Sequence, residues 1–86
     1  MNISVELTLT PLQDDFEPVI IAFIKRLRAS HLKVLENPLS TQVFGDYHEV
    51  MTILTLEIKN AFELIDNGLI QMKIVKSDRY DYEPNF

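Results

Sequence analysis

Cysteine is absent from the 86-residue sequence, which excludes disulfides, a thiol nucleophile and a zinc–thiolate site. This absence fits a reducing compartment. No stretch approaches the ~18 consecutive apolar residues that a membrane-spanning helix requires. The N-terminal stretch MNISVELTLTPL alternates between apolar and polar residues, whereas a signal peptide carries an apolar block behind a basic start. We therefore expect a cytoplasmic protein with no membrane partner.

Glycine and basic residues are both scarce. Gly45 and Gly68 are far apart, and two isolated glycines cannot form a loop that cradles phosphate. Lys and Arg number 8 against 13 Asp and Glu, which gives a net charge of −5. This balance argues against nucleic acid as a partner, because phosphate contacts need clustered basic residues. It is mildly favourable for a small cation.

The sequence gives little support for a catalytic or metal site. His31 and His48 have no partner at the spacing typical of metal ligands or of acid–base pairs. No base or oxyanion hole can be identified beside Ser40, so a small hydrolase ranks below the other hypotheses. We expect no enzyme activity, no catalytic residues and no metal.

The length predicts a single domain over residues 1–86, because a chain of this size supports one small core. With no disulfide and no metal cage, association into a dimer or tetramer would add stability. Ile21, Ile53 and Leu64 lie off the main apolar stripes of the expected helices. Together they suggest a subunit contact.

Two hydrophobic periods alternate along the chain. Apolar residues at every second position predict strands over residues 3–9 and 70–74. Two further short strands are expected over residues 32–36 and 41–45, on either side of the Asn37-Pro38 break. Apolar residues at helical spacing predict a helix that begins after the N-cap candidates Asp14 and Asp15 and stops near Ser30. A second helix would begin at Asp46 and stop at Asn67-Gly68. Residues 77–86 have no period and form a polar, aromatic tail.

The order βαββαβ predicts an α+β fold, the ferredoxin-like sandwich. Two right-handed crossovers produce a four-stranded antiparallel sheet with two helices on one face. The other face would carry the polar side chains of Ser4, Glu6, Thr8, Gln71 and Lys73. RNA-recognition domains share this topology, but they need basic and aromatic residues on the central strands, and the stretch TQVFGDY contains no basic residue.

The stretch NPLSTQVFGDYHEVM, residues 37–51, places three hydrogen-bonding side chains in a row at Ser40, Thr41 and Gln42. In one interpretation, Ser40 and Thr41 form hydrogen bonds with backbone groups of a turn, and Gln42 lies on the solvent-facing side of the strand. Alternatively, they form a recognition loop for a small polar ligand. Glu6 is a further candidate, because glutamate is depleted in strands. It either pairs with Lys73 across the sheet or anchors a cation or an amino group.

Three stretches, VELTLTPL, IIAFIKRLRAS and NPLSTQVFGDYHEVM, resemble the thiamine-binding, YkoF-like family, long catalogued as a domain of unknown function. The resemblance covers residues 2–77, and S-T-Q-V-F-G-D-Y is its most specific part. It implies a ferredoxin-like fold whose sheets pack together in dimers, often dimers of dimers. It also implies binding of thiamine or its hydroxymethylpyrimidine part without catalysis, so thiamine would be a ligand and no cofactor is expected.

The resemblance also implies which residues face the ligand: Glu6, Thr8, Asn37, Ser40, Thr41 and Gln42, with Phe44 as a wall. Thr10 and Leu39 depart from the family pattern, since many relatives have an aromatic residue and a methionine there. The expected function is a carrier, buffer or sensor of thiamine or a related pyrimidine. The alternative is a structural or regulatory homo-oligomerisation module with no small-molecule ligand.

Overall fold

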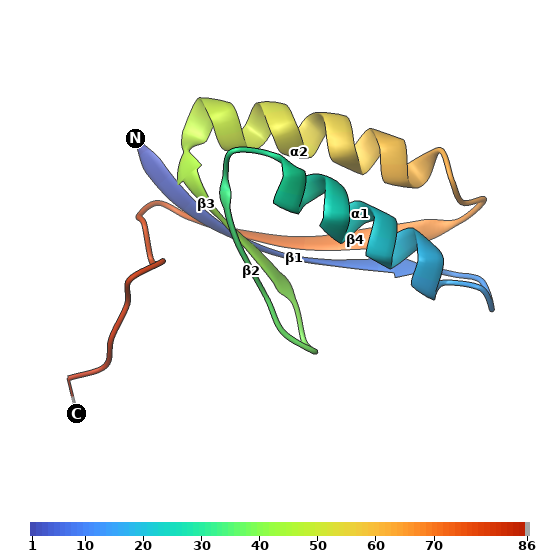
Figure 1. The fold of residues 1–86 in the computed structure, drawn as a ribbon, viewed down its shortest axis with the longest axis horizontal. Coiled ribbons are helices and arrows are strands. Elements are labelled where there is room, and N and C mark those ends of the chain that lie inside the picture. Colours follow the sequence, from blue (N-terminus) through green and yellow to red (C-terminus); the bar gives the residue numbers. More distant parts are fainter. Residues whose placement is uncertain (86) are drawn as a thin grey trace.

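The computed structural model describes residues 1–85, which form one antiparallel sheet with both helices on one of its faces (Figure 1). The strand order is β2-β3-β1-β4, which confirms the predicted α+β, ferredoxin-like fold. Neither helix within the described residues is long and apolar enough to cross a membrane. The elements are β1 (Asn2–Pro11), α1 (Glu17–Ala29), β2 (Lys33–Glu36), β3 (Thr41–Asp46), α2 (Tyr47–Phe62) and β4 (Gly68–Val75).

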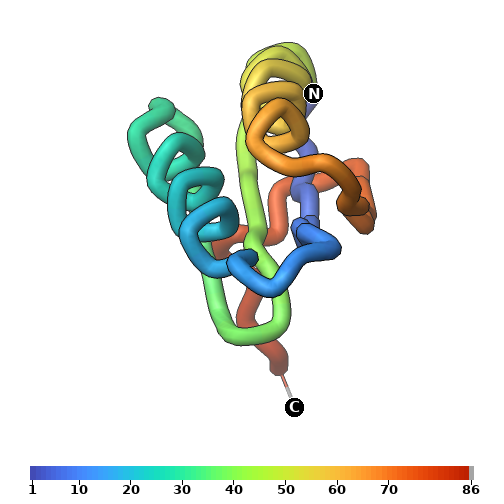
Figure 2. The backbone as a smooth tube through the Cα atoms, turned by 90° about the vertical axis from the view of Figure 1, so that its right-hand side faces the viewer, coloured from blue at the N-terminus to red at the C-terminus, as the bar shows by residue number. Residues whose placement is uncertain are grey.

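The core lies between the sheet and the two helices, which run side by side above it (Figure 2). Alternate residues of β1 point toward the helices, so the apolar half of the strand is buried and the polar half faces away. Each helix contributes one apolar stripe to the same core. The residues that β1, α1 and α2 contribute to the hydrophobic core are Ile3, Val5, Leu7, Leu9, Val19, Phe23, Leu27, Val50, Leu54 and Ala61.

The start of α1 differs from the prediction. Phe16 is the N-cap residue, and it makes no side-chain cap hydrogen bond, so neither Asp14 nor Asp15 caps this helix. The carbonyl oxygen of Asp15 instead accepts a hydrogen bond of 2.8 Å from Gln13 Nε2. Pro18 lies in the first turn, as expected. Because proline has no N–H, it leaves this helix end with one donor fewer to satisfy.

The predicted boundaries of α2 are right at its start and wrong at its end. The helix stops at Phe62, several residues before Asn67. Leu64 N and Ile65 N donate to carbonyl oxygens three residues back, which tightens the chain into a turn. Gly68 begins β4 opposite Pro11 and does not end the helix. A β-carbon at Gly68 would collide with Ile65 Cδ1 and lie 3.1 Å from Thr10 O, so close approach to β1 explains this glycine.

The residues predicted to form a subunit contact do not share one environment. Ile21 and Leu64 are 49% and 52% exposed, respectively. Ile53 is partly buried and packs against the core. Ile21 and Leu64 are therefore the two that a partner could reach directly, and self-association stays a prediction.

Asp46 caps α2, as predicted, because its Oδ2 accepts hydrogen bonds from His48 N at 3.1 Å and Glu49 N at 3.4 Å. Partial desolvation by itself raises the pKa of Asp46. The bond from Glu49 N, the N-terminal ammonium 3.5 Å from Oδ1 and the bond from His48 N together outweigh it and hold the pKa below its usual value. The ionised carboxylate is thus the form that stabilises the fold.

We expect Asp46→Ala to lower the melting temperature at pH 7 by about 4–8 °C, the shift that loss of one helix cap causes in a domain of this size. Asp46→Asn should stay close to the wild type, because asparagine caps equally well. A carboxyl group with a lowered folded-state pKa stabilises above its unfolded value, about 3.9, and loses that effect as the pH falls through the folded value. The gap between wild type and Asp46→Ala should therefore shrink below about pH 4. Calorimetric melting at pH 7 and pH 3 measures both differences, and a gap that stays constant would contradict the assignment.

Candidate functional site

The strand register gathers polar side chains on the face of the sheet that the helices leave open. Glu6 of β1 lies opposite Gln42 of β3 and opposite Lys73 of β4. Directly paired residues share a face, so these three side chains form one row across three strands, named here the Glu6 row. Thr8 and Gln71 form the next row on the same face. The predicted open-face residues therefore do lie together.

The Glu6 carboxylate has two partners in the structure. Lys73 Nζ lies 3.6 Å from Oε1, which confirms the cross-strand pair. Ser40 Oγ donates a hydrogen bond of 3.1 Å to Oε2. A carboxylate offers about four acceptor sites, so further donors can still bind it. The Glu6 and Lys73 side chains are 44% and 71% exposed, which leaves them accessible to a ligand.

Beside the Glu6 row the surface is hollowed into an open recess of about 310 Å³. Its lining residues are Glu6, Thr8, Gln71, Met72 and Lys73. The volume falls at the lower end of the ~300–1,000 Å³ typical of small-molecule sites. Most of the lining is polar or charged, so the recess suits a small heterocycle with hydrogen-bonding groups.

In the hairpin between β2 and β3, some of the polar groups form hydrogen bonds that stabilise the turn itself. Asn37 Oδ1 accepts hydrogen bonds from Leu39 N at 2.8 Å and Ser40 N at 3.1 Å. Asn37 N in turn donates to Ser40 O at 3.1 Å. The Asn37 side chain is thus engaged in turn chemistry. The hairpin contacts the open face through Ser40, and through Thr8 Oγ1, which donates to Leu39 O at 3.4 Å.

Thr41 lies on the other side of the sheet from Glu6. It pairs with Leu7, faces the helices and is 7% exposed. Next to it, a pocket of about 140 Å³ lies between the hairpin and α1. Four of the predicted ligand residues, Thr8, Asn37, Ser40 and Thr41, line it together with apolar residues such as Ile20 and Ile24. This volume is well below the ~300 Å³ at which ligand sites begin. The predicted cluster Ser40-Thr41-Gln42 is therefore divided between the two faces of β3.

Phe44 lies on the open face but is only 3% exposed, because the C-terminal tail covers it. The ring of Tyr80 meets the ring of Phe44 edge to face, with centroids 5.4 Å apart. Phe44 therefore lies beneath Tyr80 and is not an exposed wall for a ligand. Residues 77–86 have no period from which this contact could be predicted.

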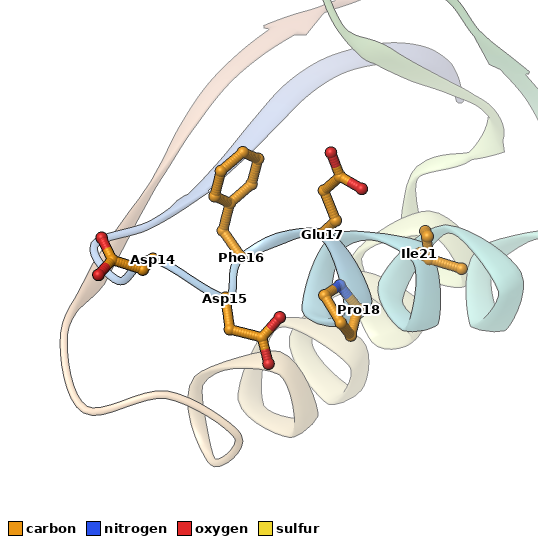
Figure 3. A pocket seen from close by; sticks show the side chains of 6 residues that line it. All are labelled: Asp14, Asp15, Phe16, Glu17, Pro18 and Ile21. Atoms are coloured by element: carbon orange, nitrogen blue, oxygen red, sulfur yellow. The ribbon is translucent and has the colours of Figure 1, made fainter.

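A further depression, of about 280 Å³, lies at the start of α1 (Figure 3). Its carboxylates, on Asp14, Asp15 and Glu17, point in different directions and do not converge on one position (Figure 3). Among residues 1–85, no group of three or more His, Asp or Glu side chains is placed to hold a metal ion.

A broader groove, of about 560 Å³, lies between α1 and α2. Ile53 and Leu56 contribute apolar surface to it, while Arg26 and Glu57 on its rim face each other at 3.9 Å. Apolar surface with paired charges suits a protein contact better than a polar heterocycle.

Both histidines lie far from Ser40. His31 Nε2 is 3.3 Å from Glu49 Oε2 in the first turn of α2, and His48 occupies the same turn. Ser40 precedes β3 whereas α2 follows it, so the length of the strand, about 20 Å at the usual rise per residue, separates them. Neither histidine can therefore act as a base for the Ser40 hydroxyl in this arrangement.

No family model and no curated protein matches the chain. Solved structures do: protein SP2199 from Streptococcus pneumoniae is 26% identical, with a TM-score of 0.84 over 91% of this chain and 89% of that one. A candidate thiamine biosynthesis/salvage protein from Thermotoga maritima is 19% identical, with a TM-score of 0.81 over 90% and 85%. The domain of unknown function DUF77 from Bacillus cereus is 11% identical, with a TM-score of 0.77 over 91% and 78%.

At these identities the likeness establishes a shared fold. The fold and the recess together define a small α+β domain with a polar, charged depression on the open face of its sheet.

Proposed function

We propose that the protein binds thiamine, or the hydroxymethylpyrimidine part of thiamine, on the Glu6 row and the open recess beside it, and releases it unchanged. The observation that carries the proposal is the Glu6 row, in which a carboxylate held by Ser40 and Lys73 stands beside the amide of Gln42. The resemblance of the sequence to thiamine-binding proteins supports the choice of ligand. The fold shared with a candidate thiamine biosynthesis/salvage protein agrees with it.

The chemistry of the row matches an aminopyrimidine. The exocyclic amino group of the ligand would donate to the Glu6 carboxylate, and the Gln42 amide would donate to a ring nitrogen. The positively charged thiazolium ring would lie away from Lys73, because two cations repel each other. Thiamine would therefore place its neutral pyrimidine near the Glu6–Lys73 pair and its cationic ring farther along the open face, away from Lys73.

Isothermal titration with thiamine tests the proposal. We expect saturable binding by the wild type and a loss of about 5- to 30-fold in affinity for Gln42→Ala, because an unpaired polar group in a complex costs about 1–2 kcal/mol. Gln13→Ala is the matched control, since Gln13 is exposed in the loop before α1. Equal affinity of Gln42→Ala and Gln13→Ala, or no heat with the wild type, would contradict the proposal.

The alternative function, a homo-oligomerisation module, is favoured by one feature of β4. This strand is an edge of the sheet, and on the helix side it exposes Met72 by 41% and Ile74 by 46%. Exposed apolar edge strands readily pair with another chain. Light scattering on the titration samples separates the two functions. A stable oligomer together with no thiamine heat would support the module over the binder.

A further inference from the structure

The first part of the C-terminal tail packs on the open face of the sheet. Ser4 Oγ donates to Ser77 O at 2.6 Å and accepts a hydrogen bond from Arg79 N at 2.8 Å. Ser4 is consequently only 7% exposed, although it faces away from the helices. Figure 1 shows the tail leaving β4 toward the side of the sheet opposite the helices. We name residues 77–82 the belt.

The belt crosses the sheet along a single row of residues. Ser4 pairs with Phe44, and Phe44 pairs with Lys33 of the edge strand β2. The belt covers Ser4 first and then reaches Phe44 through the ring of Tyr80. This row is two residues along each strand from the Glu6 row, a distance of about 6.6 Å. The belt therefore lies over the row next to the Glu6 row.

The hairpin bounds the same face at its other end. Ser40 reaches Glu6, and Leu39 O accepts from Thr8, so the hairpin lies against the polar rows. Figure 1 shows the tip of the hairpin and the tail on the same side of the sheet, away from the helices. A ligand on the Glu6 row would thus meet the hairpin in one direction and the belt in the other.

Tyr80 already holds a cation in this structure. Lys33 Nζ lies 4.6 Å from the centroid of the Tyr80 ring, within the range of a cation–π contact. Lysine is a flexible, solvated cation and can leave such a position at little cost. The thiazolium of thiamine carries a fixed positive charge next to its pyrimidine. Its charge is repelled by Lys73 at one end of the Glu6 row and attracted by the Tyr80 ring beside the row.

We propose that Tyr80 is a specificity-determining residue: it selects ligands with a cationic ring by exchanging the Lys33 ammonium for the thiazolium. This inference rests on the proposed function, since it assumes that the pyrimidine binds at the Glu6 row. It assigns to Tyr80 the aromatic wall that the family resemblance implies for Phe44. The neutral hydroxymethylpyrimidine fragment does not reach Tyr80 and gains nothing from it.

Titrations with two ligands, thiamine and 4-amino-5-hydroxymethyl-2-methylpyrimidine, test this inference. We expect Tyr80→Ala to weaken thiamine binding about three- to tenfold and to leave the affinity for the neutral fragment within about twofold. Tyr80→Phe should bind both ligands as the wild type does, because the ring face remains. Lys33→Met should strengthen thiamine binding alone, since it removes the competing ammonium. Tyr82→Ala is the matched control within the belt, because Tyr82 is 57% exposed.

The outcomes separate this inference from the function on which it rests. If Tyr80→Ala loses affinity equally for both ligands, the belt only supports the fold of the site, and the role proposed for Tyr80 is overturned. Unchanged thiamine affinity would overturn it as well. Binding of the neutral fragment without binding of thiamine would overturn the inference and leave a pyrimidine site in place. No binding of either ligand by the wild type would overturn both.

Discussion

Leu54→Ala is expected to lower the free energy of unfolding by about 2–5 kcal/mol, the usual cost of truncating a fully buried leucine. Leu54 is 1% exposed and lies in the stripe with which α2 packs on the sheet. Since a chain of this length is stable by only about 4–13 kcal/mol in total, the variant should unfold at a much lower urea concentration. Urea titration followed by circular dichroism at pH 7 measures the change.

Leu56→Ala is the matched control for that experiment. Leu56 is in the same helix, two residues away, and its side chain is 57% exposed. The same substitution there should change the free energy of unfolding by no more than about 0.5 kcal/mol, because little apolar area is uncovered. Equal losses at the two positions would mean that α2 is rotated about its axis relative to the sheet, or that its outer face is covered by another subunit.

The fold was predictable because the apolar residues follow two clear periodicities, one typical of strands and one typical of helices. Residues 3–9 alternate strictly, and β1 buries each second residue as that alternation predicts. Residues 16–27 place apolar side chains at helical spacing, and α1 buries Val19, Phe23 and Leu27. The order of these elements then leaves few topologies, since crossovers are right-handed and connections short.

Element ends were less predictable, because several residue types can end or begin a helix. Asp15 has the right chemistry for a cap, yet Phe16 takes that position and no side chain caps α1. Asn67-Gly68 has the composition of a helix stop, but the chain has already turned after Phe62. A glycine is needed at position 68 because the chain passes close to Thr10 of β1, and these two residues are far apart in sequence.

The placement of the candidate residues on the sheet was predictable in part. Glu6, Thr8 and Gln42 share the open face, and Ser40 reaches it through its hydroxyl. The alternation of side chains along β3 already argues against Thr41 as an open-face residue. Residues 41 and 43 must share a face, and Val43 belongs to the core. The cover over Phe44 could not be predicted. Tyr80 lies in a segment without a period, and only the folded chain brings the two rings together.

Glu6→Gln is expected to weaken thiamine binding by about 10- to 100-fold, which is the largest effect on binding that we expect from one substitution. The carboxylate would accept a hydrogen bond from the amino group of the ligand and would offset the charge of its thiazolium. Glutamine keeps the shape but loses the charge, and its amide hydrogens would face either Lys73 or the amino group. Isothermal titration at low and high salt measures the loss, which should be larger at low salt.

Folding should be almost unaffected by this substitution, because the Glu6–Lys73 pair is accessible to solvent and such pairs contribute at most about 1 kcal/mol. Glu63→Gln removes the same charge from an exposed position at the end of α2, so it controls for the effect of net charge on a cationic ligand. If Glu6→Gln and Glu63→Gln bind thiamine with the same affinity, the carboxylate of Glu6 serves only as the sheet partner of Lys73 and Ser40. In that case any pyrimidine site on this face would depend on the amide of Gln42 instead.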